Sequence, residues 1–294
     1  MREIVLPAKE TAKKVENFLK KEFPIGYVRK LFRKNGVRIN GRRAKEDDLV
    51  RAGDRIQLYV PFDTTAKTLT PGARRSSLET IFEDQALLVI NKPAGLAVHE
   101  GRTVSKRESI LGILETRFHA AAIVPRLVHR LDKDTSGLLM IAKNQRTADE
   151  LERLFESGGI GKEYLCLVVG RLPANEGKID FPLPGREGNP VQALTRFRVL
   201  KRYSETTLAR VQIETGRLHQ IRLHFAELGY PVVMDDQHGD FDFNKRFRKQ
   251  HGLKRQFLHA EKLKVKYGGK QREWIAPLAS DLKQLLSRLA DFQS

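Results

Sequence analysis

Cysteine is nearly missing from this chain of 294 residues, which contains Cys166 alone. A single thiol cannot form a disulfide within the chain, so we expect a reducing compartment. The sequence also has no apolar run long enough to span a bilayer, no signal-peptide pattern and no lipidation motif. These absences predict a cytoplasmic protein without a membrane partner.

Sites for small ligands also have little support. No Gly-x-x-x-x-Gly-Lys-Ser/Thr loop is present, so the usual phosphate cradle for a nucleotide is missing. His219 and His224 are five residues apart, which puts them on opposite faces of a strand and makes them a poor pair on a helix. We therefore expect neither a metal site nor a bound cofactor.

Positive charge, in contrast, is plentiful. Lysine and arginine total 54 against 36 aspartate and glutamate, a formal net charge of +18, which favours a polyanionic partner and nucleic acid above all. One basic cluster falls on a helix predicted for residues 27–34 and on the segment after it. Its members are Arg29, Lys30, Arg33, Lys34, Arg42 and Arg43. A second cluster, in residues 244–255, is interpreted as an RNA-facing loop, although a solvated surface would also explain either cluster.

Residues 1–61 have the pattern of a small domain. Two amphipathic helices precede two alternating strands, and the strands adjoin the tight-turn signals Asn40-Gly41 and Gly53-Asp54. These elements are predicted for residues 12–23, 27–34, 37–40 and 55–60. The order resembles the S4 RNA-binding module, with matches at Val37, Ile39, Asn40, Gly41, Gly53, Asp54 and Ile56. The resemblance implies a domain that contacts RNA phosphates without reading sequence.

A second domain is predicted for residues 78–294, after a linker at residues 62–77 that is rich in Thr, Pro, Gly and Ser and lacks periodicity. Its most informative stretch is residues 129–137, His-Arg-Leu-Asp-Lys-Asp-Thr-Ser-Gly. The apolar run that follows is typical of a buried strand, so the polar turn before it can hold Asp132 at a sheet edge that faces a cleft. Taken alone, Asp132 is better explained as a solvated acid in a capped turn, because aspartate is common in surface turns.

The string His-Arg-Leu-Asp-x-x-Thr-Ser-Gly resembles the signature of the RNA pseudouridine synthases of the large-subunit rRNA and tRNA type. Further motifs of that family follow in order along nearly the whole chain. They are Asn91-Lys92-Pro93 with Gly95, Lys162-x-Tyr164, residues 215–224 (Thr-Gly-Arg-Leu-His-Gln-Ile-Arg-Leu-His), residues 229–239 and Leu258-His259-Ala260.

The resemblance implies a function for specific residues. Asp132 would be the catalytic carboxylate, Tyr164 would lie beside the target base, and Arg222 would form an ion pair with Asp132. Arg130 would fill the space left by a flipped-out uridine, with His129 in contact with RNA beside it. The reaction would isomerise uridine to pseudouridine without a cofactor.

The resemblance also implies the fold class. We expect an α+β catalytic domain with a long mixed, mainly antiparallel sheet and flanking helices, preceded by the small α/β S4 domain. We further expect a monomer. The sequence leaves open whether Asp132 attacks the sugar or the base.

Four residues depart from the family pattern: Leu218 stands for Thr, Tyr230 for His, Met234 for Gly and His238 for Tyr. Because they lie away from the three catalytic positions, they bear on loop shape and target choice. The S4-like unit and the high charge favour large-subunit rRNA as substrate. The alternatives are a tRNA pseudouridine synthase and a non-catalytic RNA-binding or ribosome-assembly protein with the same fold.

Overall fold

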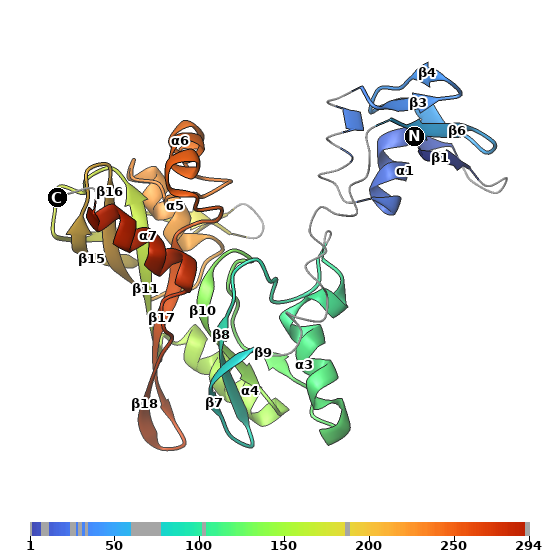
Figure 1. Ribbon diagram of the computed structural model, residues 1–294. Coiled ribbons are helices and arrows are strands. Elements are labelled where there is room, and N and C mark those ends of the chain that lie inside the picture. The colour runs from blue at the N-terminus through green and yellow to red at the C-terminus, as the bar shows by residue number, and fades with distance from the viewer. Residues whose placement is uncertain are drawn as a thin grey trace. The chain divides into compact units, whose positions relative to one another are not determined.

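Figure 1 shows the computed structural model of the chain, which divides into two compact units, Met1–Ser76 and Ser77–Ser294. The structure describes residues 2–6, 12–23, 28, 31–32, 35–59, 78–101, 104–185 and 189–291. The predicted linker at residues 62–77 lies outside these ranges, as do Arg29, Lys30, Arg33 and Lys34. In the described part of the chain, no helix combines the length and the apolar character needed to cross a membrane.

The first unit contains a four-stranded antiparallel sheet in the order β1-β6-β3-β4 and a two-stranded sheet of β2 and β5. Its elements are β1 (Arg2–Val5), β2 (Lys13–Lys14), α1 (Val15–Glu22), β3 (Val37–Ile39), β4 (Arg42–Arg43), β5 (Leu49–Val50) and β6 (Arg55–Leu58). Helix α1 begins three residues later than predicted, because Lys13 and Lys14 pair with β5. Val15 and Leu19 from α1 are fully buried against Ile56 of β6.

The predicted turn at Asn40-Gly41 joins β3 to β4. Both residues have positive φ, 49° for Asn40 and 82° for Gly41, as a two-residue hairpin loop of type I′ requires. The Asn40 amide donates to Asp54 Oδ1 at 2.8 Å and accepts from the Arg55 backbone N–H at 2.9 Å. Two residues of the S4-like pattern therefore tie the two predicted turns together, although the identity of this unit as an S4 domain stays a prediction.

The second unit is built on a ten-stranded sheet. Its main path runs β12-β15-β16-β11-β17-β10-β8-β7, with β18 paired to β17 and β9 paired to β10. The pair β10-β17 is parallel and the other described pairs are antiparallel. The predicted fold class, α+β with a long mixed and mainly antiparallel sheet, is confirmed.

The strands of this unit are β7 (Glu79–Glu83), β8 (Leu87–Lys92), β9 (Arg126–Leu127), β10 (Ser136–Ala142), β11 (Ile160–Val169), β12 (Glu176–Ile179), β13 (Leu183–Pro184), β14 (Pro190–Val191), β15 (Thr195–Arg202), β16 (Thr206–Ile213), β17 (Leu258–Tyr267) and β18 (Lys270–Ile275). The helices are η1 (Lys106–Glu108), α3 (Ile110–Phe118), η2 (His119–Ala121), α4 (Gln145–Glu156), α5 (Gln220–Glu227), α6 (Phe241–His251) and α7 (Ser280–Asp291).

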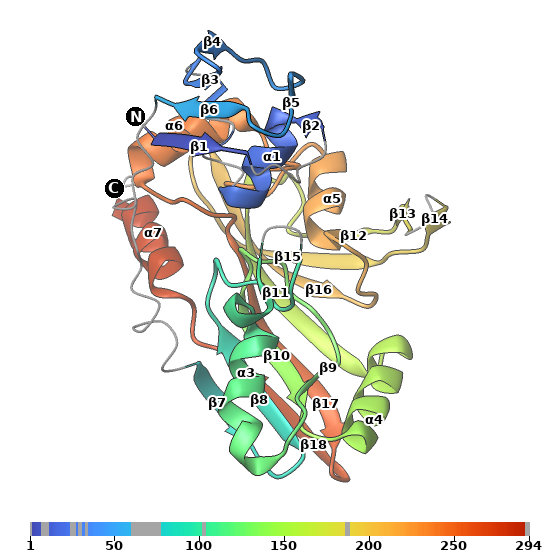
Figure 2. The ribbon, with the colours of Figure 1, turned by 90° about the vertical axis from the view of Figure 1, so that its right-hand side faces the viewer.

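Helices cover both faces of the sheet. Along β10, Leu139 and Ile141 enter a core cluster that also holds residues of α3 and α5, whereas Leu138 and Met140 enter a cluster with α4. This alternation follows from the two-residue period of a strand. Helix α4 packs beside β9 and β10, and α5 lies over β15 (Figure 2). The central strands are thus covered on both sides, which confirms the buried strand predicted after the Thr-Ser-Gly turn.

The interpretation of residues 244–255 as a loop is wrong, because most of this segment lies in helix α6. Asp240 caps the helix by accepting a hydrogen bond from the Phe243 backbone N–H at 2.9 Å, and Gly252, with φ of 73°, ends it. Phe243 and Phe247, one turn apart, pack into the cluster that also holds α7. The cations on both sides of Phe247, which are Lys245, Arg246, Arg248 and Lys249, conceal the helical period.

Candidate active site

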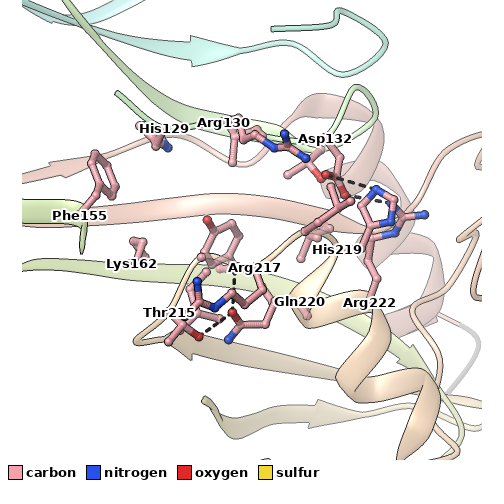
Figure 3. Close-up of a pocket in the computed structure, with 18 of the residues that line it drawn as sticks. His129, Arg130, Asp132, Phe155, Lys162, Thr215, Arg217, His219, Gln220 and Arg222 are labelled. Carbon is pink, nitrogen blue, oxygen red and sulfur yellow. Dashed lines mark hydrogen bonds and ion pairs between the residues drawn. The ribbon is translucent and has the colours of Figure 1, made fainter. Parts of the chain in front are cut away.

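A cavity of about 330 Å³ lies beside the central strands β11 and β17 (Figure 3). Its walls come from the loop before β10, the end of α4, β11, and the segment that joins β16 to α5. The residues predicted to be catalytic or to contact the flipped base all line it: Asp132, Tyr164, Arg222, Arg130 and His129. Segments about 90 residues apart in the sequence are therefore brought to one hollow.

Asp132 lies in the loop between β9 and β10, and its side chain is 23% exposed. Arg222 Nη1 donates a hydrogen bond to Asp132 Oδ2 at 3.0 Å, so the expected contact between the two residues is present (Figure 3). On the other carboxylate oxygen, His219 Nε2 lies 3.8 Å from Oδ1. Asp132 is thus held at one oxygen while it stays accessible from the cavity.

Arg222 itself is held more firmly by a second aspartate. Its Nε and Nη2 donate to the two carboxylate oxygens of Asp235, both at 2.7 Å. Arg222 is 3% exposed and Asp235 is fully buried. This two-point geometry fixes the plane of the guanidinium and so the direction in which Nη1 points. The sequence placed Asp235 in a family motif but assigned it no role.

The turn around Asp235 stabilises its charge. Burial alone would raise the pKa of this carboxyl group, but the hydrogen bonds from Arg222 and from the backbone N–H groups of His238 and Gln237 outweigh burial and lower it. The backbone bonds measure 3.0 Å and 2.9 Å. Asp235 therefore stays ionised at neutral pH and keeps the Arg222 charge compensated.

Met234, one of the departures from the family pattern, has a left-handed backbone with φ of 63°. Glycine, the family residue at this position, adopts such a φ without steric cost, whereas an L-residue pays roughly 1–2 kcal/mol. The Asn244 side chain holds the turn by accepting from the Met234 N–H and donating to the Asp235 carbonyl, both at 2.8 Å. The Met234 side chain is 3% exposed and packs in the α6–α7 cluster.

Hydrogen bonds from Lys92 hold the loop that carries Asp132. Lys92 is fully buried, and its Nζ donates to the backbone carbonyls of Pro93, Leu96 and Lys133 at 3.0, 2.9 and 3.0 Å. Burial lowers the pKa of the amine to about 7, against the opposing effect of the Asp134 charge. Three acceptors require three N–H donors, which the ammonium form supplies. The Asn-Lys-Pro motif thus holds the residue next to Asp132, a role that the sequence did not reveal.

The Thr-Ser-Gly end of the signature is fixed by residues around the Leu-His-Ala motif. Thr135 Oγ1 accepts from Gln256 Nε2 at 2.7 Å, and Ser136 Oγ lies 2.9 Å from His259 Nδ1. Gly137 has φ of +113°, and a Cβ there would lie 2.2 Å from the Ala260 carbonyl oxygen. A glycine is required because β10 and β17 approach too closely for any side chain.

Tyr164 and Lys162 share the face of β11 that lines the cavity, as predicted. Tyr164 is 8% exposed, and burial, with a smaller contribution from the Asp132 charge, raises the pKa of its phenol. The phenol therefore stays protonated at neutral pH. Burial lowers the pKa of Lys162, whose Nζ donates to the Glu214 carbonyl at 3.4 Å.

His129 and Arg130 occupy different surroundings. His129 Nε2 accepts from the Met140 N–H at 2.9 Å, and its ring stacks on Phe155 with centroids 4.5 Å apart. Burial, aided by the Lys162 charge, lowers the pKa of His129 to about 3, so the ring is neutral and mainly ties the loop to β10. Arg130 is exposed, and its side chain extends toward Asp132 (Figure 3). RNA contact by these two residues stays a prediction.

Gln220 fixes the loop on the opposite side of the cavity. Its Oε1 accepts from Thr215 Oγ1 at 2.7 Å and from the Arg217 N–H at 3.1 Å. Its Nε2 donates to the Leu194 carbonyl at 3.0 Å and to Thr195 Oγ1 at 3.1 Å. All four hydrogen-bonding positions of this buried amide are used, so residues 215–219 have a defined shape. Among the described residues, no group of three or more His, Cys, Asp or Glu side chains is placed to hold a metal ion.

Several known proteins are similar to this chain in sequence and in fold. The family described as RNA pseudouridylate synthase matches residues 86–227. Ribosomal large subunit pseudouridine synthase C of Escherichia coli (strain K12) is 32% identical over 97% of this chain and 96% of its own length. The protein of the same name from Vibrio cholerae is 32% identical over 94% of this chain and 93% of its own length.

A solved structure supports the fold. Human RNA pseudouridylate synthase domain containing 4 superposes with a TM-score of 0.64 at 23% identity, over 75% of this chain and 97% of that one. The sequence relatives span nearly the whole chain and are enzymes, which argues against the non-catalytic alternative. On these similarities, the chain belongs to the RNA pseudouridine synthase family, as its motifs predicted, and is an enzyme that isomerises uridine in RNA.

Proposed function

We propose that this enzyme forms pseudouridine in large-subunit ribosomal RNA and that Asp132 is its reacting carboxylate. The substrate is supported by the names of the relatives from Escherichia coli and Vibrio cholerae. The role of Asp132 is supported by one observation above all: its carboxylate is bound by Arg222 at 3.0 Å and also lines the cavity of about 330 Å³. A carboxylate that is both oriented and accessible is what a nucleophile or general base requires.

The reaction begins with extrusion of the uridine, because its glycosidic bond is hidden in the stacked RNA. Extrusion costs a few kcal/mol, and Arg130, exposed at the cavity, is placed to occupy the vacated space. Asp132 then acts on the nucleotide, the bond between N1 and C1′ breaks, and the base turns while it is held. C5 bonds to C1′, the proton on C5 leaves, and N1 gains a proton, so the atoms of uridine are conserved.

Tyr164 and Arg222 assist in different ways. The Tyr164 ring lines the cavity, where a pyrimidine can stack on it, and its phenol, with a raised pKa, offers a hydrogen-bond donor and not a charge. Arg222, fixed by Asp235, orients the Asp132 carboxylate. We assign Tyr164 to holding the base and Arg222 to orienting the acid.

Exposed cations away from the cavity support contact with the RNA backbone. In the second unit, the exposed side of α6 carries Lys245, Arg246, Arg248 and Lys249. In the first unit, Arg42 and Arg43 are exposed on β4. Such side chains neutralise phosphates without reading bases. We propose that the first unit is an S4-like domain that increases affinity for RNA, whereas the cavity selects the nucleotide.

The substrate is tested by offering purified enzyme separate pools of large-subunit rRNA and tRNA transcripts and mapping pseudouridine at single-nucleotide resolution. We expect new pseudouridine in the rRNA, none in the tRNA, and none in either pool with the Asp132→Asn variant. Modification confined to tRNA would contradict the proposed substrate. Equal modification by the Asp132→Asn variant would contradict the role of the carboxylate.

A further inference from the structure

A pair of histidines continues the site beyond the Asp132 carboxylate. His219 Nδ1 lies 3.0 Å from His238 Nε2, and His219 Nε2 lies 3.8 Å from Asp132 Oδ1. The two rings meet edge to face, with centroids 5.2 Å apart and an interplanar angle of 61°. Figure 3 shows the His219 ring beside both Asp132 and Arg222. His238, His219 and Asp132 thus form a row. The row ends at Oδ1 of Asp132, the oxygen that Arg222 does not bind.

The backbone of His219 is held in a costly conformation to place this ring. Its φ of 54° is left-handed, which costs an L-residue roughly 1–2 kcal/mol. The residue directly precedes α5, where its carbonyl accepts from the Leu223 N–H at 2.9 Å, and the Gln220 amide fixes the loop before it. Backbone strain that the surroundings enforce is a common feature of functional sites.

The contact between the rings constrains where their protons lie. Two ring nitrogens 3.0 Å apart need one proton between them. If His219 carried that proton on Nδ1 and were neutral, its Nε2 would present a lone pair to the Asp132 carboxylate, which is repulsive. If His238 Nε2 carries the proton, His219 is protonated on Nε2 and presents an N–H to Asp132 Oδ1, which is attractive.

The charges around His219 are consistent with a neutral ring. Burial lowers its pKa, the Asp132 charge opposes this, and the charges of Arg222 and His238 lower it further, while Asp235 raises it. A neutral His219 has a single N–H, so the choice of tautomer decides whether that N–H serves Asp132.

We propose that His238 is a positioning residue that fixes the tautomer of His219 and thereby keeps an N–H donor on the Oδ1 side of Asp132. This inference rests on the proposed role of Asp132. A separation of 3.8 Å is too long for a hydrogen bond, and such contacts tighten when substrate fills an active site. Arg222 and His219 then hold the carboxylate from both oxygens. A tyrosine at this position would have a hydroxyl group that can make the same donation.

The test compares His238→Phe with His238→Tyr, which differ by one hydroxyl group. His238→Phe removes the donor, so we expect kcat on rRNA to fall about 10- to 100-fold, with the Kd for RNA unchanged within about twofold. His238→Tyr restores a donor and should recover most of kcat. His119→Phe, an exposed histidine outside the cavity, is the matched control and should leave kcat unchanged. Circular dichroism confirms that each variant is folded.

A spectroscopic readout keeps the test independent of activity. In nitrogen NMR of protein labelled in its histidines, wild-type His219 should show a protonated Nε2 and an unprotonated Nδ1 in the pH range where the ring is neutral. His238→Phe should lose this preference and His238→Tyr should retain it. An Asp132→Asn variant as active as wild type would contradict the proposed role of Asp132, whereas the tautomer of His219 tests this inference separately.

Three outcomes would overturn the proposal. The first is a wild-type His219 that carries its proton on Nδ1. The second is a His238→Phe variant with unchanged kcat and an unchanged tautomer. The third is an equal loss of kcat in His238→Phe and His238→Tyr, which would mean that ring packing matters and the donated hydrogen bond does not.

Discussion

Two loops of the second unit each present an aspartate to the same guanidinium, and they do so in different ways. The turn after Val233 buries Asp235 completely and gives it two 2.7 Å bonds from Arg222 and two from backbone N–H groups. The loop before β10 leaves Asp132 23% exposed and gives it one 3.0 Å bond from the same arginine.

The difference separates two roles: Asp235 fixes Arg222, and Asp132 is left to react. Asp235 is fully buried and already accepts four hydrogen bonds, so its carboxylate is closed to a substrate. Asp132 is oriented through Oδ2. A single N–H from His219 on the Oδ1 side leaves that oxygen a further lone pair for chemistry. Arg222 therefore connects the two acids: Asp235 fixes the plane of the Arg222 guanidinium, and Arg222 in turn orients Asp132.

The largest effect is expected from a substitution of Asp235, the buried one of the two aspartates. Asp235→Asn leaves the Arg222 charge buried with its main partner gone, so we expect the free energy of unfolding to fall by about 3–5 kcal/mol. Asp132→Asn should change it by less than about 1 kcal/mol, because the partly exposed pair contributes little. Urea unfolding of both variants measures the difference. Equal losses would mean that the two acids do not differ in role.

The next largest effect is expected at Lys92, which holds the loop that carries Asp132. Lys92→Met removes the donor to three buried carbonyls, and we expect a loss of about 2–4 kcal/mol in the free energy of unfolding. Lys143→Met, at a cation that pairs with Glu83 nearer the surface, serves as the control and should cost less. A Lys92→Met variant as stable as wild type would show that the loop is held by other contacts.

A smaller effect tests the turn that presents Asp235. Met234→Ala and Met234→Gly both remove a buried side chain, so both should destabilise the protein. Glycine tolerates the φ of 63° that alanine does not, so Met234→Gly should be more stable than Met234→Ala by about 1 kcal/mol. Thermal unfolding gives the order, and a more stable alanine variant would refute the left-handed backbone.

The smallest expected change is confined to acid pH. Because the pKa of Asp235 is lower in the folded protein than in the unfolded chain, its contribution to stability is present above the unfolded pKa near 4 and is lost as the pH falls through the folded pKa. Asp235→Asn should therefore flatten the acid limb of stability against pH. An acid limb of unchanged slope would mean that other carboxyl groups account for it.

Much of the site could be predicted from the sequence, because its residues lie in contiguous motifs. Asp132, Tyr164 and Arg222 were named from three such motifs, and they line one cavity. Hydrophobic periodicity could not predict that these residues lie close together. Asp132 and Arg222 are 90 residues apart, and the order of strands in the sheet brings their segments to the same place. The resemblance to a known family supplied that connection.

The supporting residues could not be predicted for a different reason. Lys92 and Asp235 are charged residues that the fold buries. No sequence pattern marks their partners, which include the Lys133 carbonyl 41 residues from Lys92 and the Arg222 guanidinium 13 residues from Asp235. Sequence patterns record which residues alternate or repeat, but they do not record which polar groups need a partner after burial. Helix α6 was missed because its period rests on the few residues that face inward.

Tritium release tests the separation of roles most directly, because isomerisation replaces the C5–H bond of uridine with C5–C1′. Asp132→Asn is mixed in excess with large-subunit rRNA labelled with tritium at C5, and the single-turnover rate is compared with that of wild type. We expect a rate at least about 1,000-fold lower, with RNA affinity unchanged within about twofold. A rate within about tenfold of wild type would show that Asp132 is not the reacting group.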